Sequence, residues 1–294
     1  MIISFVIPTY NRITSTHRCV RTIFDQSIDD LPITYEIIIS LDARDRGYEK
    51  HIHECKLCSE VIVTKAQQNG VNAARNAGVR KAAGEIICFL DDDCVLPDEK
   101  WIARLFDCIN EHPKIKVVGG FYLSDDQTAL MDRFRNCQAN HFISLHITKD
   151  NRTTALLGGA STYRKEVFQQ YGLFDETLRY GSAETEFNRR LANAGELMMC
   201  LDLLSVVHCP IKQSMRSYSI KSFFQGKGFA YVHQRYGREP MHTKQFSIME
   251  ILSQCADTTF TRLYALSFLF VSAIFFKLGY FWQRICLRSL INAD

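Results

Sequence analysis

The stretch Gly84-Glu-Ile-Ile-Cys-Phe-Leu-Asp91-Asp92-Asp93 decides the fold. Residues 85–90, which are apolar and β-prone after Glu85, have the composition of a buried parallel strand. Three carboxylates follow the strand, and their mutual repulsion is costly unless a cation lies between them. Ligands bind at the carboxyl ends of strands in open α/β sheets. We therefore predict a Mg²⁺ or Mn²⁺ site formed by carboxylate oxygens and substrate phosphates.

A helix cap is the simpler explanation of the same acidic residues. A helix is expected to start near Pro97-Asp98, and aspartate is favoured at N-caps. One aspartate is enough for a cap, whereas this stretch contains three in succession. The triplet therefore favours the metal site.

Strand and helix signals alternate through the first part of the chain. We expect strands at 2–7, 35–41, 61–63 and 85–90, and helices at 14–27, 48–58 and 72–83. Thr14 or Ser15 is expected to cap the first helix, and Gly84 to end the third in a left-handed conformation. This order predicts an α/β fold with a doubly wound, mainly parallel sheet and helices on both faces.

The middle of the chain is less regular. A helix at 101–111 and a strand at 116–123 are expected, and residues 124–152 have the polarity of a loop that covers a site. A helix at 184–194 and a strand at 203–207, which ends at His208, follow. His208 is a candidate metal ligand, with a core histidine as the alternative.

Composition limits the functional classes. The 294 residues carry a net charge of +3, which gives no argument for nucleic-acid binding. The apolar start lacks a basic segment and meets Pro8, so it is expected to be a strand and not a signal peptide. The 11 cysteines then suggest free thiols in a reducing compartment, the cytoplasm.

The last third, 211–294, is basic and apolar and is expected to form a helical C-terminal extension. Residues 208–245 contain seven lysines and arginines against one acid, and residues 263–276 are uncharged. That run is shorter than the roughly 20 apolar residues that span a bilayer. Aromatic-rich helices with basic neighbours often lie in the membrane interface. We expect peripheral membrane association, with a buried helix, a subunit contact or a membrane span as alternatives.

Three further stretches suit a nucleotide. The segment from Val6 to Arg12, with Pro8 and Thr9, follows the first strand, and Asp42 follows the second. The segment Asn69-Gly-Val-Asn-Ala-Ala-Arg75 begins a helix whose free N–H groups and arginine suit phosphate oxygens. Taken singly, each of these stretches also fits an ordinary turn or an exposed helix. Neither a Walker A loop nor a Gly-x-Gly-x-x-Gly turn is present, so an ATPase or a dinucleotide enzyme is not supported.

Two acids at a helix start are candidates for proton transfer. Glu184 is the candidate general base. Glu186 is a candidate either to orient Glu184 or to bind a metal ion. Acids are also favoured at helix N-termini for electrostatic reasons alone.

In order and spacing, these motifs resemble the inverting family 2 glycosyltransferases with the GT-A fold. The resemblance covers roughly residues 2–210, and residues 1–210 are expected to form the nucleotide-sugar-binding and catalytic domain. It implies that Asp93, with His208, holds the metal and that Glu184 is the catalytic base, with Glu186 in reserve. It implies nucleotide-sugar contacts from Pro8, Thr9, Asp42, Asn69, Arg75, Asp91, Asp92 and Gly159. Among these, Thr9 and Asp42 would hold the nucleoside and Arg75 the diphosphate.

Two positions depart from the family pattern. Leu41 stands where the family usually has an acid before Asp42, and the usual Glu-Asp of the base motif is Ala183-Glu184 here. Glutamate is one methylene longer than aspartate, so a change in acceptor geometry is expected.

The resemblance implies transfer of a sugar from a nucleotide-diphosphate sugar, with a UDP-sugar favoured. The acceptor would be a carbohydrate or a lipid-linked saccharide, in surface polysaccharide or glycolipid assembly. The protein would lie in the cytoplasm, peripherally on the inner face of the cell membrane. The rival hypotheses are a sugar nucleotidyltransferase and a non-catalytic membrane-surface binding protein with a decayed site.

Overall fold

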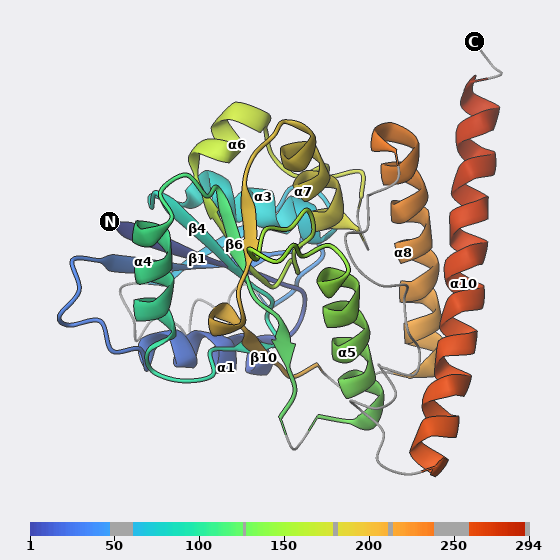
Figure 1. The fold of residues 1–294 in the computed structure, drawn as a ribbon, viewed down its shortest axis with the longest axis horizontal. Coiled ribbons are helices and arrows are strands. Elements are labelled where there is room, and N and C mark those ends of the chain that lie inside the picture. The colour runs from blue at the N-terminus through green and yellow to red at the C-terminus, as the bar shows by residue number, and fades with distance from the viewer. Residues whose placement is uncertain (48–60, 126–127, 179–181, 211–213, 238–258, 292–294) are drawn as a thin grey trace.

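The computed structural model describes residues 1–47, 61–125, 128–178, 182–210, 214–237 and 259–291 (Figure 1). Within these ranges, nothing is assigned to the side chains of residues 183, 259–260 and 287–291. The helix expected at 48–58 lies outside the described residues.

A seven-stranded sheet forms the centre of the molecule, in the order β3-β2-β1-β4-β8-β6-β9 (Figure 1). Six of its strands run in one direction, and β8 is antiparallel to both of its neighbours. The strands are β1 (Ile2–Thr9), β2 (Thr34–Leu41), β3 (Val61–Lys65), β4 (Ile86–Leu90), β6 (Val117–Gly119), β8 (Ala160–Arg164) and β9 (Met198–Cys200). The mainly parallel sheet predicted from the alternating pattern is confirmed.

Helices surround this sheet and bury its apolar faces. They are α1 (Ile13–Phe24), α3 (Val71–Lys81), α4 (Trp101–Glu111), α5 (Leu130–Ser144), α6 (Glu166–Tyr171) and α7 (Ala183–Asn193). Helix α3 packs on β1 so closely that a Cβ at Gly78 would lie 2.3 Å from Cγ1 of Val6. This contact packs the second half of α3 against the middle of β1.

The strand expected at 116–123 is two strands in different sheets. Strand β6 ends at Gly119, and β7 (Tyr122–Leu123) joins β5 (Cys94–Val95) and β10 (Val206–His208) in a small sheet of order β5-β10-β7. Gly120 lies between them, and a Cβ there would be 2.3 Å from the Leu204 backbone. The expected strand at 203–207 is likewise divided, into the 3₁₀ turn η1 (Asp202–Leu204) and β10.

Residues 124–152, whose polarity gave no firm assignment and suggested a loop over a site, contain the helix α5 at 130–144. The buried face of this helix includes two polar side chains, Asp132 and Asn136, together with Phe134 and Ile143. The regular spacing of apolar residues that marks an amphipathic helix is therefore missing from this part of the sequence.

Both expected helix-end assignments are also wrong. Arg12 occupies the N-cap of α1 without a side-chain cap bond, and Ser15 Oγ instead donates to the Asp92 carbonyl at 2.7 Å. Helix α3 ends at Ala82 in an extended conformation. Gly84 is needed for packing, since a Cβ there would lie 2.6 Å from Ser4 Oγ.

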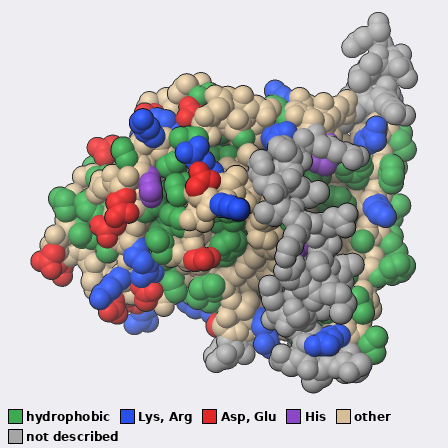
Figure 2. All heavy atoms as spheres, viewed as in Figure 1, with side chains coloured by type: hydrophobic (Ala, Val, Ile, Leu, Met, Phe, Trp, Pro, Cys, Tyr) green, Lys and Arg blue, Asp and Glu red, His purple; other side chains and the backbone are tan. Residues whose placement is uncertain are grey.

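Two long parallel helices, α8 (Met215–Tyr236) and α10 (Thr259–Ile291), form the C-terminal part of the described chain. They touch through glycines: a Cβ at Gly226 would lie 2.0 Å from the Phe276 carbonyl, and one at Gly279 would lie 1.9 Å from that of Phe223. Hydrophobic side chains line the edge of the molecule that α10 forms (Figure 2). The segment Thr261–Cys286 is long and apolar enough to cross a membrane, a criterion of length and composition alone.

Candidate active site

The carboxyl ends of β1, β2 and β4 border a pocket of about 300 Å³, as expected for an open α/β sheet. Helices α5 and α8 close its other side. The lining residues are Pro8, Thr9, Tyr10, Arg12, Asp42, Val71, Ala74, Asp91, Asp92, Asp93, Arg135, His208 and Lys221.

Two of the three acids after β4 share one cation. Nη1 of Arg12 lies 2.9 Å from a carboxylate oxygen of Asp92 and 2.9 Å from one of Asp93. Thr9 Oγ1 donates to Asp92 at 2.6 Å. Asn11 makes this approach possible, because its left-handed conformation (φ 53°) turns the chain between β1 and α1. The positive charge of Arg12 thus offsets the repulsion expected between Asp92 and Asp93.

The two carboxylates respond differently to this environment. Burial and the neighbouring Asp93 raise the pKa of Asp92 to about 6, against the effect of Arg12. Burial also acts to raise the pKa of Asp93, but His208 and Arg12 hold it well below its ordinary value. Asp93 is therefore ionised throughout the physiological range.

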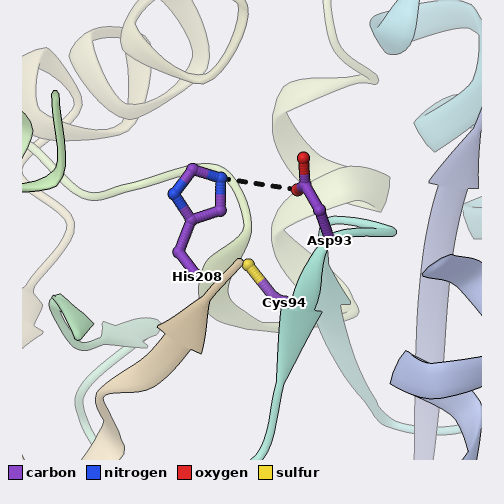
Figure 3. A group of neighbouring side chains, drawn as sticks. All are labelled: Asp93, Cys94 and His208. Atoms are coloured by element: carbon purple, nitrogen blue, oxygen red, sulfur yellow. Dashed lines mark ion pairs between the residues drawn. The ribbon is translucent and has the colours of Figure 1, made fainter. Parts of the chain in front are cut away.

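Asp93 and His208 fit a divalent cation. Nε2 of His208 lies 3.4 Å from Oδ1 of Asp93, and ligand atoms of Asp93, Cys94 and His208 lie within 4.8 Å of one another (Figure 3). Burial raises the pKa of the Cys94 thiol well above its ordinary value, so it stays neutral. The remaining donors, a carboxylate oxygen and an imidazole nitrogen, suit Mn²⁺ or Mg²⁺.

Helix α5 orients His208 through residues that the sequence did not identify. Oδ1 of Asn136 lies 2.6 Å from Nδ1 of His208, and its Nδ2 donates to Ser124 Oγ at 2.9 Å. Tyr122 stacks on the imidazole with ring centroids 4.3 Å apart. Because the Asn136 Nδ2 donates elsewhere, its oxygen accepts from Nδ1, and Nε2 is the ring nitrogen that faces Asp93.

Arg75 joins the third acid to the candidate base. Its guanidinium lies 3.2 Å from Asp91 and 3.4 Å from Glu184. A Cβ at Gly158 would lie 2.4 Å from the Arg75 guanidinium, and one at Gly159 would lie 2.4 Å from the Asp91 carboxyl. The glycine pair is therefore required for this arrangement.

The two acids of α7 have different surroundings. The Glu184 side chain is 28% exposed, whereas that of Glu186 is 2% exposed. Glu186 accepts hydrogen bonds from Arg190 at 2.7 Å and from Tyr236 at 2.6 Å, so its oxygens are already used in joining α7 to α8. Ser182, directly before α7, has a left-handed backbone (φ 56°), a conformation that clusters at functional sites.

Asp42 lies at the other end of the pocket. Arg44 contacts it at 2.9 Å, and the Gly70 N–H donates to it at 2.7 Å. Burial acts to raise its pKa, but these hydrogen bonds hold the pKa below its ordinary value. The carboxylate is ionised and ties the end of β2 to the start of α3.

The pocket thus brings together part of the predicted set. Pro8, Thr9, Asp42, Asp91, Asp92, Asp93 and His208 line it, while Asn69, Arg75, Gly159 and Glu184 do not. The sequence analysis missed Arg12, Tyr122, Arg135, Asn136 and Lys221. Of these, only Arg12 could have been identified from the sequence, because it ends the motif that follows the first strand.

Fold and pocket together define the GT-A class of nucleotide-sugar-dependent enzymes. The chain belongs to glycosyl transferase family 2, whose family model matches residues 4–172. It is 26% identical over 234 residues to the glycosyltransferase AglE of Haloferax volcanii, covering 77% of this chain and 72% of AglE.

Solved structures share the fold at low sequence identity. The mannosyltransferase PcManGT from Pyrobaculum calidifontis, in complex with GDP-Man and Mn²⁺, matches with a TM-score of 0.59 at 15% identity, over 93% of this chain and 73% of that one. S. aureus TarS 1-349, in complex with UDP-GlcNAc, matches with a TM-score of 0.56 at 11% identity, over 97% and 92%. The resemblance to family 2 and the GT-A fold are confirmed.

Proposed function

We propose that this glycosyltransferase moves a sugar from a nucleotide-diphosphate sugar to an acceptor hydroxyl with inversion at the anomeric carbon. The observation that carries the proposal is the pocket itself, where Asp93 and His208 lie beside an acid, Asp91, that Arg75 links to Glu184. Neighbours of the same fold bind GDP-Man and UDP-GlcNAc. A UDP-sugar is the favoured donor, in line with the second of these.

Glu184 is the proposed base. The acceptor oxygen attacks the anomeric carbon on the face opposite the nucleotide, the bond from that carbon to the diphosphate breaks, and Glu184 takes the hydroxyl proton. The Arg75 contact at 3.4 Å holds the carboxylate in place while leaving it partly exposed. Glu186, the reserve candidate, is 2% exposed and already accepts hydrogen bonds from Arg190 and Tyr236, which favours Glu184 over it.

Asp93 and His208 are the proposed metal ligands, for Mn²⁺ or Mg²⁺. When bound, the ion neutralises charge on the diphosphate as it leaves. Arg12 lies against Asp93 at 2.9 Å and is the cation that the ion would displace or join. The Mn²⁺ complex of PcManGT is consistent with this assignment.

A carbohydrate or lipid-linked saccharide is the proposed acceptor, in surface polysaccharide or glycolipid assembly. Helix α10 supports a position at the inner face of the cell membrane. It contains arginines and a lysine but no acid, and its outer face carries exposed side chains such as Phe270 (69%) and Phe281 (59%). We place α10 in the plane of the interface, with these exposed aromatic side chains toward the lipid.

The Glu184→Gln variant tests the proposal. It keeps the size of the side chain and removes the base, so transfer should fall by about 10²–10⁴-fold while donor binding stays within about threefold. Glu166→Gln, which changes an exposed acid paired with Lys116 at 2.6 Å, is the matched control. Unchanged transfer by Glu184→Gln contradicts the assignment of the base. Nucleotide-sugar binding without transfer in the wild-type protein supports the rival, non-catalytic hypothesis.

A further inference from the structure

Two cations of the pocket take no part in the site described above. Arg135 belongs to α5 and Lys221 to α8, and both line the pocket with Asp93 and His208. They approach from the side opposite the sheet, where the sequence predicted no binding residue. The role assigned to them below rests on the proposed function.

The Arg135 guanidinium has unused hydrogen-bonding capacity. Its Nη1 is buried and has no hydrogen-bond partner among the described residues. Arg135 forms an ion pair with Asp132, whose Oδ1 lies 3.9 Å from Nη1, a distance too long for a hydrogen bond. The Tyr218 ring lies 5.3 Å from the guanidinium carbon. Unpaired buried N–H groups are costly, so a partner is expected in the working enzyme.

Lys221 is the second cation of the pocket whose charge is not neutralised by a close contact with another described residue. Across the described ranges, its ammonium forms no hydrogen bond or ion pair. Burial and the positive charges of Arg135 and Arg12 lower its pKa to about 8, against the opposing effect of Asp93 and Asp91. A cation in this state gains from an incoming anion.

Arg75, the residue expected to contact the diphosphate, is differently engaged. Its side chain is 4% exposed, it is paired with Asp91 and Glu184, and it does not line the pocket. Negative charge entering beside Asp93 would therefore meet the cations of α5 and α8. A diphosphate suits them, because arginine and lysine bind phosphate oxygens through charge-assisted hydrogen bonds.

We propose that Arg135 and Lys221 form a clamp that binds the diphosphate of the donor, while Arg75 positions Asp91 and Glu184. The clamp holds the charge that grows on the diphosphate as the bond to the sugar breaks. It also couples donor binding to α8, which packs against the apolar helix α10.

The test compares nucleoside diphosphates with their monophosphates by calorimetric titration. UDP and UMP, with the corresponding guanosine, thymidine and cytidine pairs, are titrated into the full chain with and without Mn²⁺. Arg135→Met and Lys221→Met should each weaken binding of the diphosphate by about tenfold or more, and binding of the monophosphate by less than about threefold. Lys227→Met, on α8 outside the pocket, is the matched control and should change neither.

Arg135→Lys covers the case in which Arg135→Met does not fold. It keeps a charge beside Asp132 but loses the planar fork, so it should still lower diphosphate affinity selectively. Equal losses for diphosphate and monophosphate, or no loss, overturn the clamp while leaving the proposed function standing. A wild-type protein that binds no nucleotide overturns both.

Discussion

Replacing Asn136 by alanine removes the hydrogen bond that fixes the His208 ring. This buried hydrogen bond joins Nδ1 of His208 to Oδ1 of Asn136 over 2.6 Å. The amide nitrogen of Asn136 in turn donates to Ser124 Oγ, which fixes the orientation of the amide. The Tyr122 ring still stacks on the imidazole in the variant, so the ring plane is retained while the tautomer is freed. The change therefore acts on the direction of Nε2. It also removes the amide donor to Leu123, Ser124 and the His208 carbonyl, so the free energy of unfolding is measured alongside.

Loss of a partner that orients a metal-ligating histidine typically costs about 10–100-fold in metal affinity. That range corresponds to about 1.4–2.8 kcal/mol. We expect Asn136→Ala to weaken Mn²⁺ binding by this factor, measured by calorimetry or by the Mn²⁺ resonance signal in the presence of UDP. Nucleotide affinity without metal should be unchanged.

Asn110→Ala, an exposed change on α4, is the matched control. Unaltered Mn²⁺ affinity in a folded Asn136→Ala protein would refute the claim that α5 orients a metal ligand. An equal fall in nucleotide affinity without metal would point instead to general damage to the pocket.

Three further predictions concern pH, packing and the membrane. Because the pKa of Lys221 is lowered to about 8 and an incoming anion raises it, UDP binding near pH 8.5 should take up protons. Calorimetry in buffers of different ionisation enthalpy measures this uptake, and its persistence in Lys221→Met would contradict the assignment. A Cβ at Gly159 would lie 2.4 Å from the Asp91 carboxyl, so Gly159→Ala should lower kcat by about tenfold with little effect on UDP affinity, because overpacking costs about 1–3 kcal/mol. An unchanged kcat would show that the Arg75–Asp91 contact is dispensable. Phe270→Asp should weaken sedimentation with anionic vesicles by about tenfold or more, whereas Leu203→Asp, exposed on η1, should not. Equal binding of the two variants would remove α10 as the membrane contact, and loss of a dimer in Phe270→Asp would assign its face to a second copy.

Much of the sheet could be predicted because its strands are continuous apolar runs bounded by turn residues. The run before Asp91 is buried on both faces, and such strands are recognised without knowledge of their neighbours. The acids after it and Thr9 lie at strand ends of one sheet, so their meeting follows from topology alone.

Helix α5 could not be predicted in the same way, because its buried face carries polar side chains whose partners are distant in sequence. Asn136 bonds to His208, 72 residues away. Arg75 was assigned to the diphosphate from its place at a helix start, but only the folded chain brings it against Glu184, 109 residues away. Contacts of this kind depend on tertiary packing that no local pattern records.

The central claim is a metal-dependent nucleotide-sugar site at Asp93 and His208. Calorimetric titration of UDP, GDP, dTDP and CDP, each with and without Mn²⁺, tests it most directly. We predict that one diphosphate binds with an affinity that Mn²⁺ raises, and that Asp93→Ala abolishes the effect of the metal. Binding that is indifferent to Mn²⁺, or no binding of any of the four by the folded protein, would contradict it.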